Sequence, residues 1–355
     1  MERVIFHIDL NAFFANAEIL LNPELENTEM VVSGLGRRSV ITTASYPARK
    51  YGIHSGMSLA KALQLCPNVM VVKGNHSFYR KLSNIFINYI KTFTDKVEKA
   101  SIDECYVDMT DVIKKYEKPY DLAMEIQRTL LQKYHMKCSI GIGANKFLAK
   151  MASDMKKPLG ITWIHDNEVA KKIWPLPISE MYGIGKRTAP VLRKAGIETI
   201  GDLANAKEND VVRKILGKNT IYYINEANGK GNDELELDHE AKSIGQSSTF
   251  NEDIVEYDEV KQLFTELASK IESRMARIHS ISNHITITIR THDFNTMVRS
   301  KKLPYYISTA DEIVEEALAL FDQYAPEDPI RLLGISCKGL KDKNASNEQL
   351  SLFQI

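Results

Sequence analysis

Long hydrophobic segments and closely spaced cysteines are both missing from this sequence of 355 residues. No apolar run approaches the roughly 20 residues that a membrane-spanning helix needs. The short apolar stretch in residues 1–14 is interrupted by Asp9 and lacks a small-residue cleavage site, so it predicts a first buried strand rather than a signal peptide. We therefore expect a cytoplasmic protein that does not contact a membrane.

The few cysteines are widely scattered: Cys66, Cys105, Cys138 and Cys337. None of them forms the close pair that a zinc site requires. Free thiols in a reducing compartment are the simplest interpretation, which argues against a disulfide-stabilised or zinc-binding protein.

The sequence also has no net charge, because 46 basic residues balance 46 acidic ones. A neutral total argues at first against nucleic acid, but the charges are unevenly distributed. Residues 1–165 hold 22 Lys and Arg against 16 acids, a net charge of +6. Four more cations lie around two predicted strands: Arg290, Arg299, Lys301 and Lys302. They could bind phosphates from one sheet face, although solvated charge on an ordinary surface explains them equally well.

Hydrophobic periodicity predicts an α+β organisation for residues 1–165. Strands are expected at residues 3–9, at 97–109 as two strands with a turn between them, and at 137–143. Amphipathic helices are expected at residues 77–94, 120–134 and 145–155. This pattern predicts a sheet with helices packed on one face, and it leaves residues 46–56 as a loop.

Two further regions follow. The chain becomes helical and rich in glycine turns from about residue 168, and a polar, acidic linker is expected at residues 231–240. Residues 241–340 then predict the order β-α-β-β-α-β of a split-βαβ domain. Residues 341–355 begin with a polar stretch, and we expect them to be disordered.

Three carboxylates are the first candidates for chemistry. Asp9 ends the strand that is expected to be buried, where a charge is costly unless it is paired or metal-bound. Asp103 and Glu104 lie at the junction of two strands. Together the three could hold two hard divalent cations, as phosphoryl-transfer enzymes require. The alternative is a solvated turn and a strand-end cap, since an Asp-Glu pair alone is weak support for a metal site.

Phosphate-binding candidates lie in two segments. Tyr46, Arg49 and Lys50 offer a hydroxyl and two cations, and Lys157 follows the third predicted helix. An arginine can hold a phosphate through two hydrogen bonds. Each segment taken alone is more often ordinary surface.

Two aromatic residues, Phe13 and Phe14, directly follow the Asp9 strand. Core packing explains at least one of the rings. The other could press on the sugar of a nucleotide and exclude a 2′-hydroxyl.

A glycine turn separates two predicted helices in the helical region. Gly183 and Gly185 allow a tight turn, and Lys186 follows them. This pattern is typical of a helix–hairpin–helix, which binds duplex DNA without reading its sequence.

In this order the motifs resemble the Y-family of translesion DNA polymerases, and most closely its bacterial DNA polymerase IV (DinB) branch. The resemblance covers essentially the whole chain. It is carried by residues 7–14, 43–52, 100–108, 139–150 and 154–160.

The resemblance implies an error-prone translesion enzyme, a mutator in DNA repair, that adds deoxynucleoside triphosphates to a primer end by two-metal phosphoryl transfer and has no proofreading exonuclease. The implied ligands of two Mg²⁺ ions are Asp9, Leu10 (through its carbonyl), Asp103 and Glu104. The implied nucleotide contacts are Phe13, Phe14, Tyr46, Arg49 and Lys157, with Phe14 as the steric gate. The implied DNA contacts are Gly183, Gly185, Lys186, Arg290, Arg299, Lys301 and Lys302.

The resemblance also implies a right-hand architecture and a set of partners. The expected parts are a palm (1–10 and 76–165), fingers (11–75), a helix–hairpin–helix thumb (166–230), a linker (231–240), a little finger (241–340) and a tail (341–355). The expected partners of this monomer are primer–template DNA, a deoxynucleoside triphosphate and a bacterial sliding clamp. The implied clamp-binding residues are Gln349, Leu350, Leu352 and Phe353.

Two other functions remain open at this point. A nucleotidyl cyclase-like enzyme uses similar carboxylates but needs no duplex-binding helical region. A DNA-binding repair scaffold without activity is disfavoured because all three carboxylates are present. The sequence departs from the family pattern at Cys105, where a small alanine-like residue is expected, and in the short segment around residues 34–38, which leaves contacts over the template base undefined.

Overall fold

The computed structural model describes residues 3–206, 210–231, 234–238 and 240–344. The chain divides into two compact units, Met1–Leu35 with Ser39–Asp238, and Gly36–Arg38 with His239–Ile355. None of the described helices combines the length and the apolar character needed to cross a bilayer.

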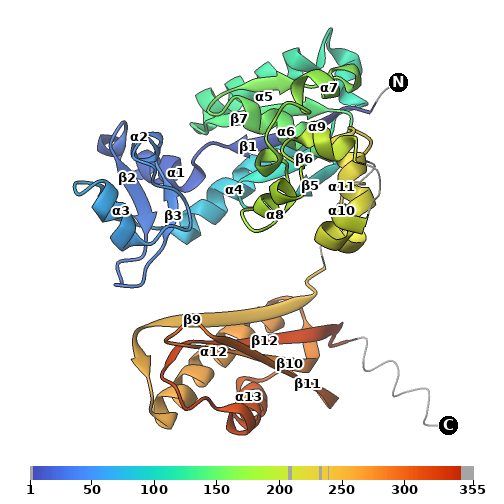
Figure 1. Cartoon of the computed structure of the whole chain (residues 1–355). Helices are drawn as coiled ribbons and strands as arrows, with labels where there is room; N and C mark the ends of the chain where they lie inside the picture. The colour runs from blue at the N-terminus through green and yellow to red at the C-terminus, as the bar shows by residue number, and fades with distance from the viewer. Residues whose placement is uncertain (1–2, 207–209, 232–233, 239, 345–355) are drawn as a thin grey trace, which may run out of the picture. The chain divides into compact units, whose positions relative to one another are not determined.

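A five-stranded sheet forms the centre of the first unit (Figure 1). Its strands, in spatial order, are β5 (Val97–Lys99), β6 (Glu104–Asp108), β1 (Ile5–Leu10), β7 (Cys138–Gly143) and β8 (Ile161–Trp163). β1 runs antiparallel to both β6 and β7, and β8 pairs with β7 in parallel. The first strand of the chain is therefore the middle strand of the sheet, and all six of its residues are buried.

Helices cover both faces of this sheet, so the prediction of helices on one face only is wrong. On one face, Phe6 and Ile8 of β1 pack in the same apolar cluster as residues of α4 (His76–Lys91) and α5 (Pro119–Tyr134). On the other face lies α6 (Lys146–Met155), whose Ala149 packs against Ile5. The approach is close: a Cβ at Gly141 of β7 would lie 1.9 Å from the Ala149 carbonyl oxygen, so only glycine fits there.

A three-stranded sheet with helices lies between β1 and α4 in the sequence. Its elements are α1 (Phe13–Leu21), β2 (Met30–Ser33), β3 (Ile41–Ala44), α2 (Tyr46–Arg49), α3 (Leu59–Leu65) and β4 (Met70–Lys73). The prediction of a loop over residues 46–56 is wrong at its beginning, where α2 forms. The Ser45 hydroxyl caps this helix by accepting a hydrogen bond from the Ala48 N–H, and Pro47 lies in its first turn.

Short helices make up most of the described part of residues 166–230. They are α7 (Val169–Lys172), α8 (Thr188–Lys194), α9 (Ile200–Ala204), α10 (Asp210–Leu216) and α11 (Thr220–Ala227). The turn before α8 has Gly183 at φ +87°, and a Cβ there would lie 3.0 Å from the Tyr223 ring. Both facts require glycine at this position.

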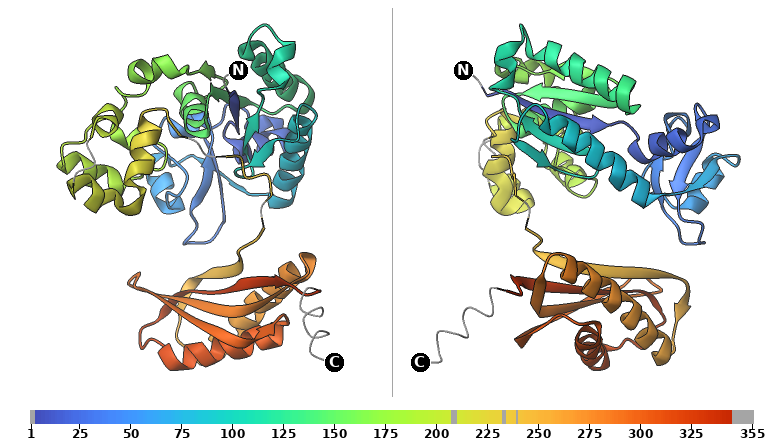
Figure 2. Two further views of the ribbon diagram at one scale, coloured as in Figure 1. Left: turned by 90° about the vertical axis from the view of Figure 1, so that its right-hand side faces the viewer. Right: turned by 180° about the vertical axis from the view of Figure 1, so that it is seen from behind.

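The second unit contains a four-stranded antiparallel sheet and two helices (Figure 2). Its elements are β9 (Ser243–Ile254), α12 (Tyr257–Arg277), β10 (Ser280–Thr291), β11 (Thr296–Ile307), α13 (Ala310–Tyr324) and β12 (Ile330–Asp342). The strand order β11-β10-β12-β9 confirms the split-βαβ prediction. Several strands are longer than predicted, and β12 extends into the segment expected to be disordered.

The two helices of the second unit pack against one face of its sheet, where Ile285, Ile287 and Ile289 of β10 are fully buried. Strand register assigns the cations of β11 to a face. Lys301 and Arg299 lie opposite Ile285 and Ile287 and share their face, while Lys302 lies opposite His284 on the other.

Contacts with α13 agree with this assignment. The Lys301 ammonium lies 2.7 Å from Glu316 of α13, and the Arg299 guanidinium lies over the ring of Tyr324.

All four cysteines are free and buried. Burial raises the pKa of the Cys105, Cys138 and Cys337 thiols. Neutral, inaccessible thiols agree with the expectation of free cysteines.

Candidate active site

A pocket of about 210 Å³ lies where β1 ends and α1 and α2 begin. It collects residues from segments that are far apart in the sequence. Predicted site residues that line it are Asp9, Leu10, Phe13, Phe14, Tyr46, Arg49, Asp103 and Lys157. Ala12, Thr42, Thr43 and Ser55 also line it and were not singled out from the sequence.

Strand pairing brings the three predicted carboxylates together. Asp9 of β1 is the register partner of Glu104, the first residue of β6. The next residue of β1, Leu10, donates its N–H to the Asp103 carbonyl over 3.0 Å. Asp9 and Glu104 are therefore positioned by strand pairing, and Asp103, in the bend before β6, is tied to β1 by this hydrogen bond.

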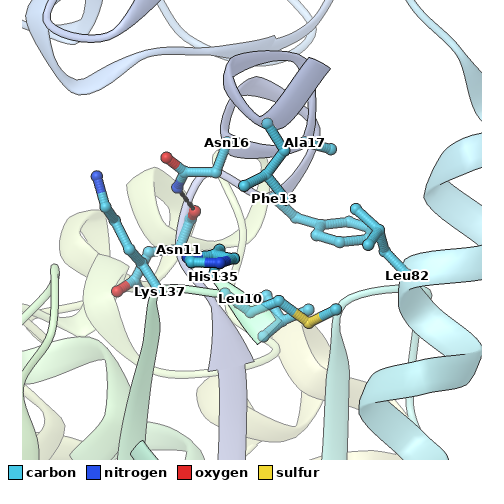
Figure 3. Close-up of a pocket in the computed structure, with 10 residues that line it drawn as sticks. Leu10, Asn11, Phe13, Asn16, Ala17, Leu82, His135 and Lys137 are labelled. Atoms are coloured by element: carbon cyan, nitrogen blue, oxygen red, sulfur yellow. Dashed lines mark hydrogen bonds between the residues drawn. The ribbon is translucent and has the colours of Figure 1, made fainter. Parts of the chain in front are cut away.

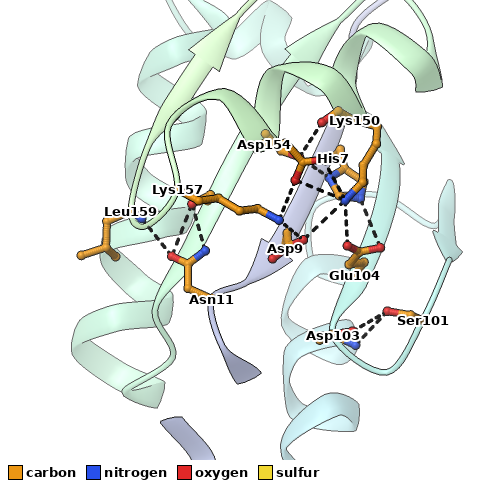
Figure 4. A network of polar contacts seen from close by, with 12 residues as sticks. His7, Asp9, Asn11, Ser101, Asp103, Glu104, Lys150, Asp154, Lys157 and Leu159 are labelled. Atoms are coloured by element: carbon orange, nitrogen blue, oxygen red, sulfur yellow. Dashed lines mark hydrogen bonds and ion pairs between the residues drawn. The ribbon is translucent and has the colours of Figure 1, made fainter. Parts of the chain in front are cut away.

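Two lysines lie among these carboxylates (Figure 4). The Lys150 ammonium of α6 lies 2.8 Å from Glu104 and 3.6 Å from Asp9. The Lys157 ammonium contacts Asp9 and lies 2.7 Å from Asp154. The two cations therefore neutralise much of the negative charge that the strand pairing gathers.

The pKa values reflect this crowding of charges. Burial, together with the neighbouring Glu104, raises the pKa of Asp9 against the opposing effect of Lys157. Burial alone would also raise the pKa of Glu104, but hydrogen bonds with His7 and Asp9 and the Lys150 charge lower it well below its usual range. Burial raises the pKa of Asp103, opposed by a hydrogen bond from Ser101.

The donor set fits hard divalent cations. Asp9 and Asp103 line one pocket and Glu104 pairs with Asp9 in the sheet, and magnesium prefers such oxygen ligands, although the three side chains do not form a preassembled metal cluster among the described residues. Asp9 is 7% exposed, and a carboxylate buried to this degree needs a cationic partner. Asp9, Asp103 and Glu104, with the backbone of Leu10, could therefore hold the metal ions.

The opposite wall of the pocket fits an anion. Arg49 lines the pocket together with Lys157, which also contacts Asp9, and the Arg49 guanidinium lies 4.8 Å from the centre of the Tyr46 ring. The Tyr46 hydroxyl is buried and has no hydrogen-bond partner in the described part of the chain. A polar atom left in this state is costly unless a ligand completes its hydrogen bonding.

The two neighbouring phenylalanines have different surroundings. Phe13 is 5% exposed and packs in the apolar core below the sheet end. A small hollow of about 10 Å³ lies behind it, lined also by Leu10, Asn11 and His135 (Figure 3). Phe14 is only partly buried and stacks on Tyr79, with ring centroids 4.4 Å apart. Of the two rings, Phe14 is the better candidate for contact with a ligand.

Sequence reasoning missed the residues that support the site. Lys150 was part of a motif but had no role assigned to it, although a lysine within the apolar run of α6 is a signal for a buried partner. Asn11 accepts a hydrogen bond from the Leu159 N–H over 2.9 Å and so ties the Lys157 segment to β1. Contacts between such distant residues have no local sequence signal.

Glu104 pairs with Asp9 in the sheet but does not line this pocket, and neither do the other predicted residues that the structure describes. Gly183, Gly185 and Lys186 belong to the helical region, and the four cations of β10 and β11 belong to the second unit. The predicted clamp-binding residues, Gln349, Leu350, Leu352 and Phe353, lie outside the described residues.

Comparisons with known proteins agree with each other. Residues 8–154 match the impB/mucB/samB family, residues 166–197 match the helix–hairpin–helix motif of that family, and residues 241–352 match its C-terminal domain. DNA polymerase IV of Oceanobacillus iheyensis is 42% identical, over 99% of this chain and 84% of that protein. DNA polymerase IV 1 of Bacillus subtilis is 39% identical, over 99% of this chain and 85% of that protein. A solved Y-family DNA polymerase chimera superposes with a TM-score of 0.87 at 27% identity, covering 95% of this chain and 99% of that one.

Two ion pairs of nearly equal length, Lys150–Glu104 and Lys114–Asp111, should contribute differently to the stability of the fold. Lys150→Met should lower the free energy of unfolding by about 3 kcal/mol without divalent cations, because it leaves buried carboxylates without their partner. Lys114→Met removes an exposed pair with Asp111, 2.7 Å long, and should cost less than about 1 kcal/mol. Urea unfolding of both variants gives the comparison, and equal losses would contradict the network's role.

Proposed function

The chain belongs to the Y-family of DNA polymerases, whose members include the DNA polymerase IV relatives described above, and we propose that it extends a primer by two-metal phosphoryl transfer at the Asp9–Asp103–Glu104 site. It is a DNA-directed DNA polymerase of the translesion type, with primer–template DNA and deoxynucleoside triphosphates as substrates. The observation that carries the proposal is that a single pocket is lined both by the carboxylates Asp9 and Asp103 and by Tyr46, Arg49 and Lys157. That family membership leaves the cyclase-like and inactive-scaffold alternatives without support.

The carboxylates and Lys150 have separate roles in this proposal. Asp9, Asp103, Glu104 and the Leu10 carbonyl would hold two Mg²⁺ ions. When bound, such ions supply electrostatic stabilisation to the reacting oxygens. Lys150 would remain beside Glu104 and Asp9 and keep their side chains oriented, because its position on α6 is fixed by close packing against β7.

The incoming triphosphate would bind in the same pocket, beside Tyr46 and Arg49. The Tyr46 hydroxyl and Arg49 would hold phosphate oxygens, helped by the backbone amides of Phe13 and Phe14. Lys157 pairs with Asp9 and Asp154 in this structure. Because its side chain also lines the pocket, it would turn to the triphosphate when one binds. The ring of Phe14 would meet the sugar and exclude a 2′-hydroxyl.

Several further properties extend the proposal. Fidelity would be low, and the enzyme would work without proofreading. The enzyme would act as a monomer in the cytoplasm. The palm, fingers, thumb and little finger would have the residue boundaries that we expect from the sequence: 1–10 with 76–165, 11–75, 166–230 and 241–340.

Removing one metal ligand tests the central proposal. Asp103→Asn keeps the shape of the side chain and removes its charge, so single-nucleotide extension with Mg²⁺ should fall roughly 10³-fold. Duplex binding should be kept, because the lost ligand acts on the reaction and not on the DNA. The control is Asp108→Asn at the other end of β6. Extension by the Asp103 variant within tenfold of the parent would exclude the two-metal assignment.

The second unit and the helical region (residues 166–230) would bind DNA through its phosphate groups. Gly183, Gly185 and Lys186 would approach one strand, as the helix–hairpin–helix match supports. Of the four cations predicted in the second unit, we propose only Arg290 and Lys302 as phosphate contacts. These two lie on the sheet face opposite α12 and α13. Arg299 and Lys301 share the helix-covered face and contact α13 instead.

Two neighbouring lysines therefore give a matched test of DNA binding. Lys302→Ala should reduce the slope of log affinity against log salt by about 1, because one phosphate contact is lost. Lys301→Ala should leave that slope nearly unchanged, since its ammonium pairs with Glu316. Fluorescence anisotropy with several duplex sequences at different salt concentrations measures both. A larger effect at Lys301, or an effect confined to one sequence, would contradict this assignment.

The last part of the proposal is docking on a sliding clamp. Residues 349–353 read Gln-Leu-Ser-Leu-Phe, in which Leu352 and Phe353 could fill an apolar groove. Tethering to a ring on DNA would raise the effective concentration of the enzyme at the primer end.

Deleting residues 349–355 should leave the extension rate of the free enzyme unchanged and remove its stimulation by the clamp. The measurement is product length on a primed circular template with and without loaded clamp. A Gln349→Ala, Leu352→Ala, Phe353→Ala variant of full length controls for the shortened chain. Full stimulation of both variants would mean that the docking site lies elsewhere.

A further inference from the structure

The ring proposed as the steric gate is held by two other aromatic rings. Phe14 stacks on Tyr79 with the ring planes 16° apart, and the edge of His76 meets it at 86°. Tyr79 and His76 also contact each other, with centroids 5.4 Å apart. The orientation of Phe14 therefore depends on the first turn of α4, which carries both neighbours.

A buried carboxylate fixes that turn. Tyr79 is fully buried, and its hydroxyl donates a hydrogen bond to Glu18. The same Glu18 oxygen accepts the backbone N–H of Asn75 over 3.1 Å, at the N-cap of α4. Glu18 is only 7% exposed, and a carboxylate at this depth is costly unless donors satisfy it. Both donors come from the beginning of α4.

Helix periodicity explains why one carboxylate can act on the gate. Phe14 and Glu18 are four residues apart in α1 and share a face, and His76 and Tyr79 are three apart in α4. Glu18 holds the far end of the Tyr79 ring, and the face of that ring supports Phe14. A weak positive potential at the N-terminus of α4 also favours the carboxylate in this place.

We propose that Glu18 is a positioning residue for sugar selection, acting through Tyr79 to hold the Phe14 ring against the 2′ position of the incoming nucleotide. The inference rests on the proposed function, because it needs Phe14 to be the gate. Without the Glu18 bond, Tyr79 loses its fixed plane and Phe14 gains freedom to move away from a 2′-hydroxyl. Small displacements of a positioning group change rates strongly.

A packing role alone predicts a different result. If Glu18 merely joined α1 to α4, its loss would lower stability and affect ribonucleotides and deoxyribonucleotides equally. The ratio of their specificity constants separates the two roles. A role in selection changes the ratio, whereas a packing role leaves it unchanged.

The experiment compares four single variants of the full chain, together with Phe14→Ala and the combinations named below, in single-nucleotide extension with matched deoxyribonucleotides and ribonucleotides. Glu18→Leu removes the acceptor, Tyr79→Phe removes the donor and keeps the ring, and Glu18→Gln keeps an acceptor oxygen of similar reach. Tyr116→Phe is the control, because it deletes a tyrosine–glutamate bond of 3.0 Å to Glu125 of α5. Melting temperatures are measured in parallel.

We expect Glu18→Leu and Tyr79→Phe each to lower the deoxyribose preference by roughly tenfold. The double variant should lose no more than Glu18→Leu alone, because both single variants delete the Tyr79–Glu18 bond. Glu18→Gln should keep most of the preference, and Tyr116→Phe should keep all of it. In a Phe14→Ala background, Glu18→Leu should have no further effect on the ratio.

The outcomes separate the inference from its premise. If Phe14→Ala alone leaves the ratio unchanged, Phe14 is not the gate and the premise fails. If Phe14→Ala lowers the ratio of specificity constants but Tyr79→Phe and Glu18→Leu do not, Phe14 is the steric gate but Glu18 does not position it. Should Glu18→Leu fail to fold, Tyr79→Phe decides the question alone.

Discussion

The antiparallel pairing of β1 with β6 and β7 is the constraint on which the other features of the first unit depend. Because successive side chains of a strand alternate between its faces, β1 directs Phe6 and Ile8 into the apolar core while Asp9 faces the α6 side. A slip of one residue in the pairing would bury Asp9 in the core and expose a hydrophobic residue instead. The same register places Glu104 opposite Asp9. Fold stability and the position of the carboxylates are therefore set by the same backbone hydrogen bonds.

That arrangement concentrates negative charge, which the chain balances with its own cations. Lys150 and Lys157 come from the same stretch of sequence but differ in their surroundings. Lys150 projects from a helix that packs so closely on β7 that Gly141 cannot be replaced. Lys157 lies in the turn beyond that helix, which Asn11 ties to the sheet, and it faces the pocket. One cation is thus fixed by packing, and the other is placed where a bound anion could attract it.

The sequence predicted those parts of the structure that have a local signal. Long amphipathic helices such as α4 and α5, and the alternating strand β10, have periodicities that tertiary packing did not override. Most of the residues lining the pocket were also predicted, because their motifs lie within short segments. The short helix α2 was missed, since its signal is one serine cap followed by a proline. Helix cover on both faces of the sheet depends on tertiary packing, and the face that each of Lys301 and Lys302 occupies depends on strand register, neither of which the sequence of one strand contains.

The buried cysteines have a practical consequence for observing this protein at work. All four thiols are inaccessible, and burial keeps at least three of them neutral. An exposed thiolate is the nucleophile that attacks a thiol-reactive dye, so the natural chain should be almost unreactive toward such dyes. A single cysteine introduced on the surface of each unit would then carry a fluorophore without any prior removal of native cysteines. Energy transfer between two such dyes could follow the separation of the units in real time as DNA and nucleotide bind.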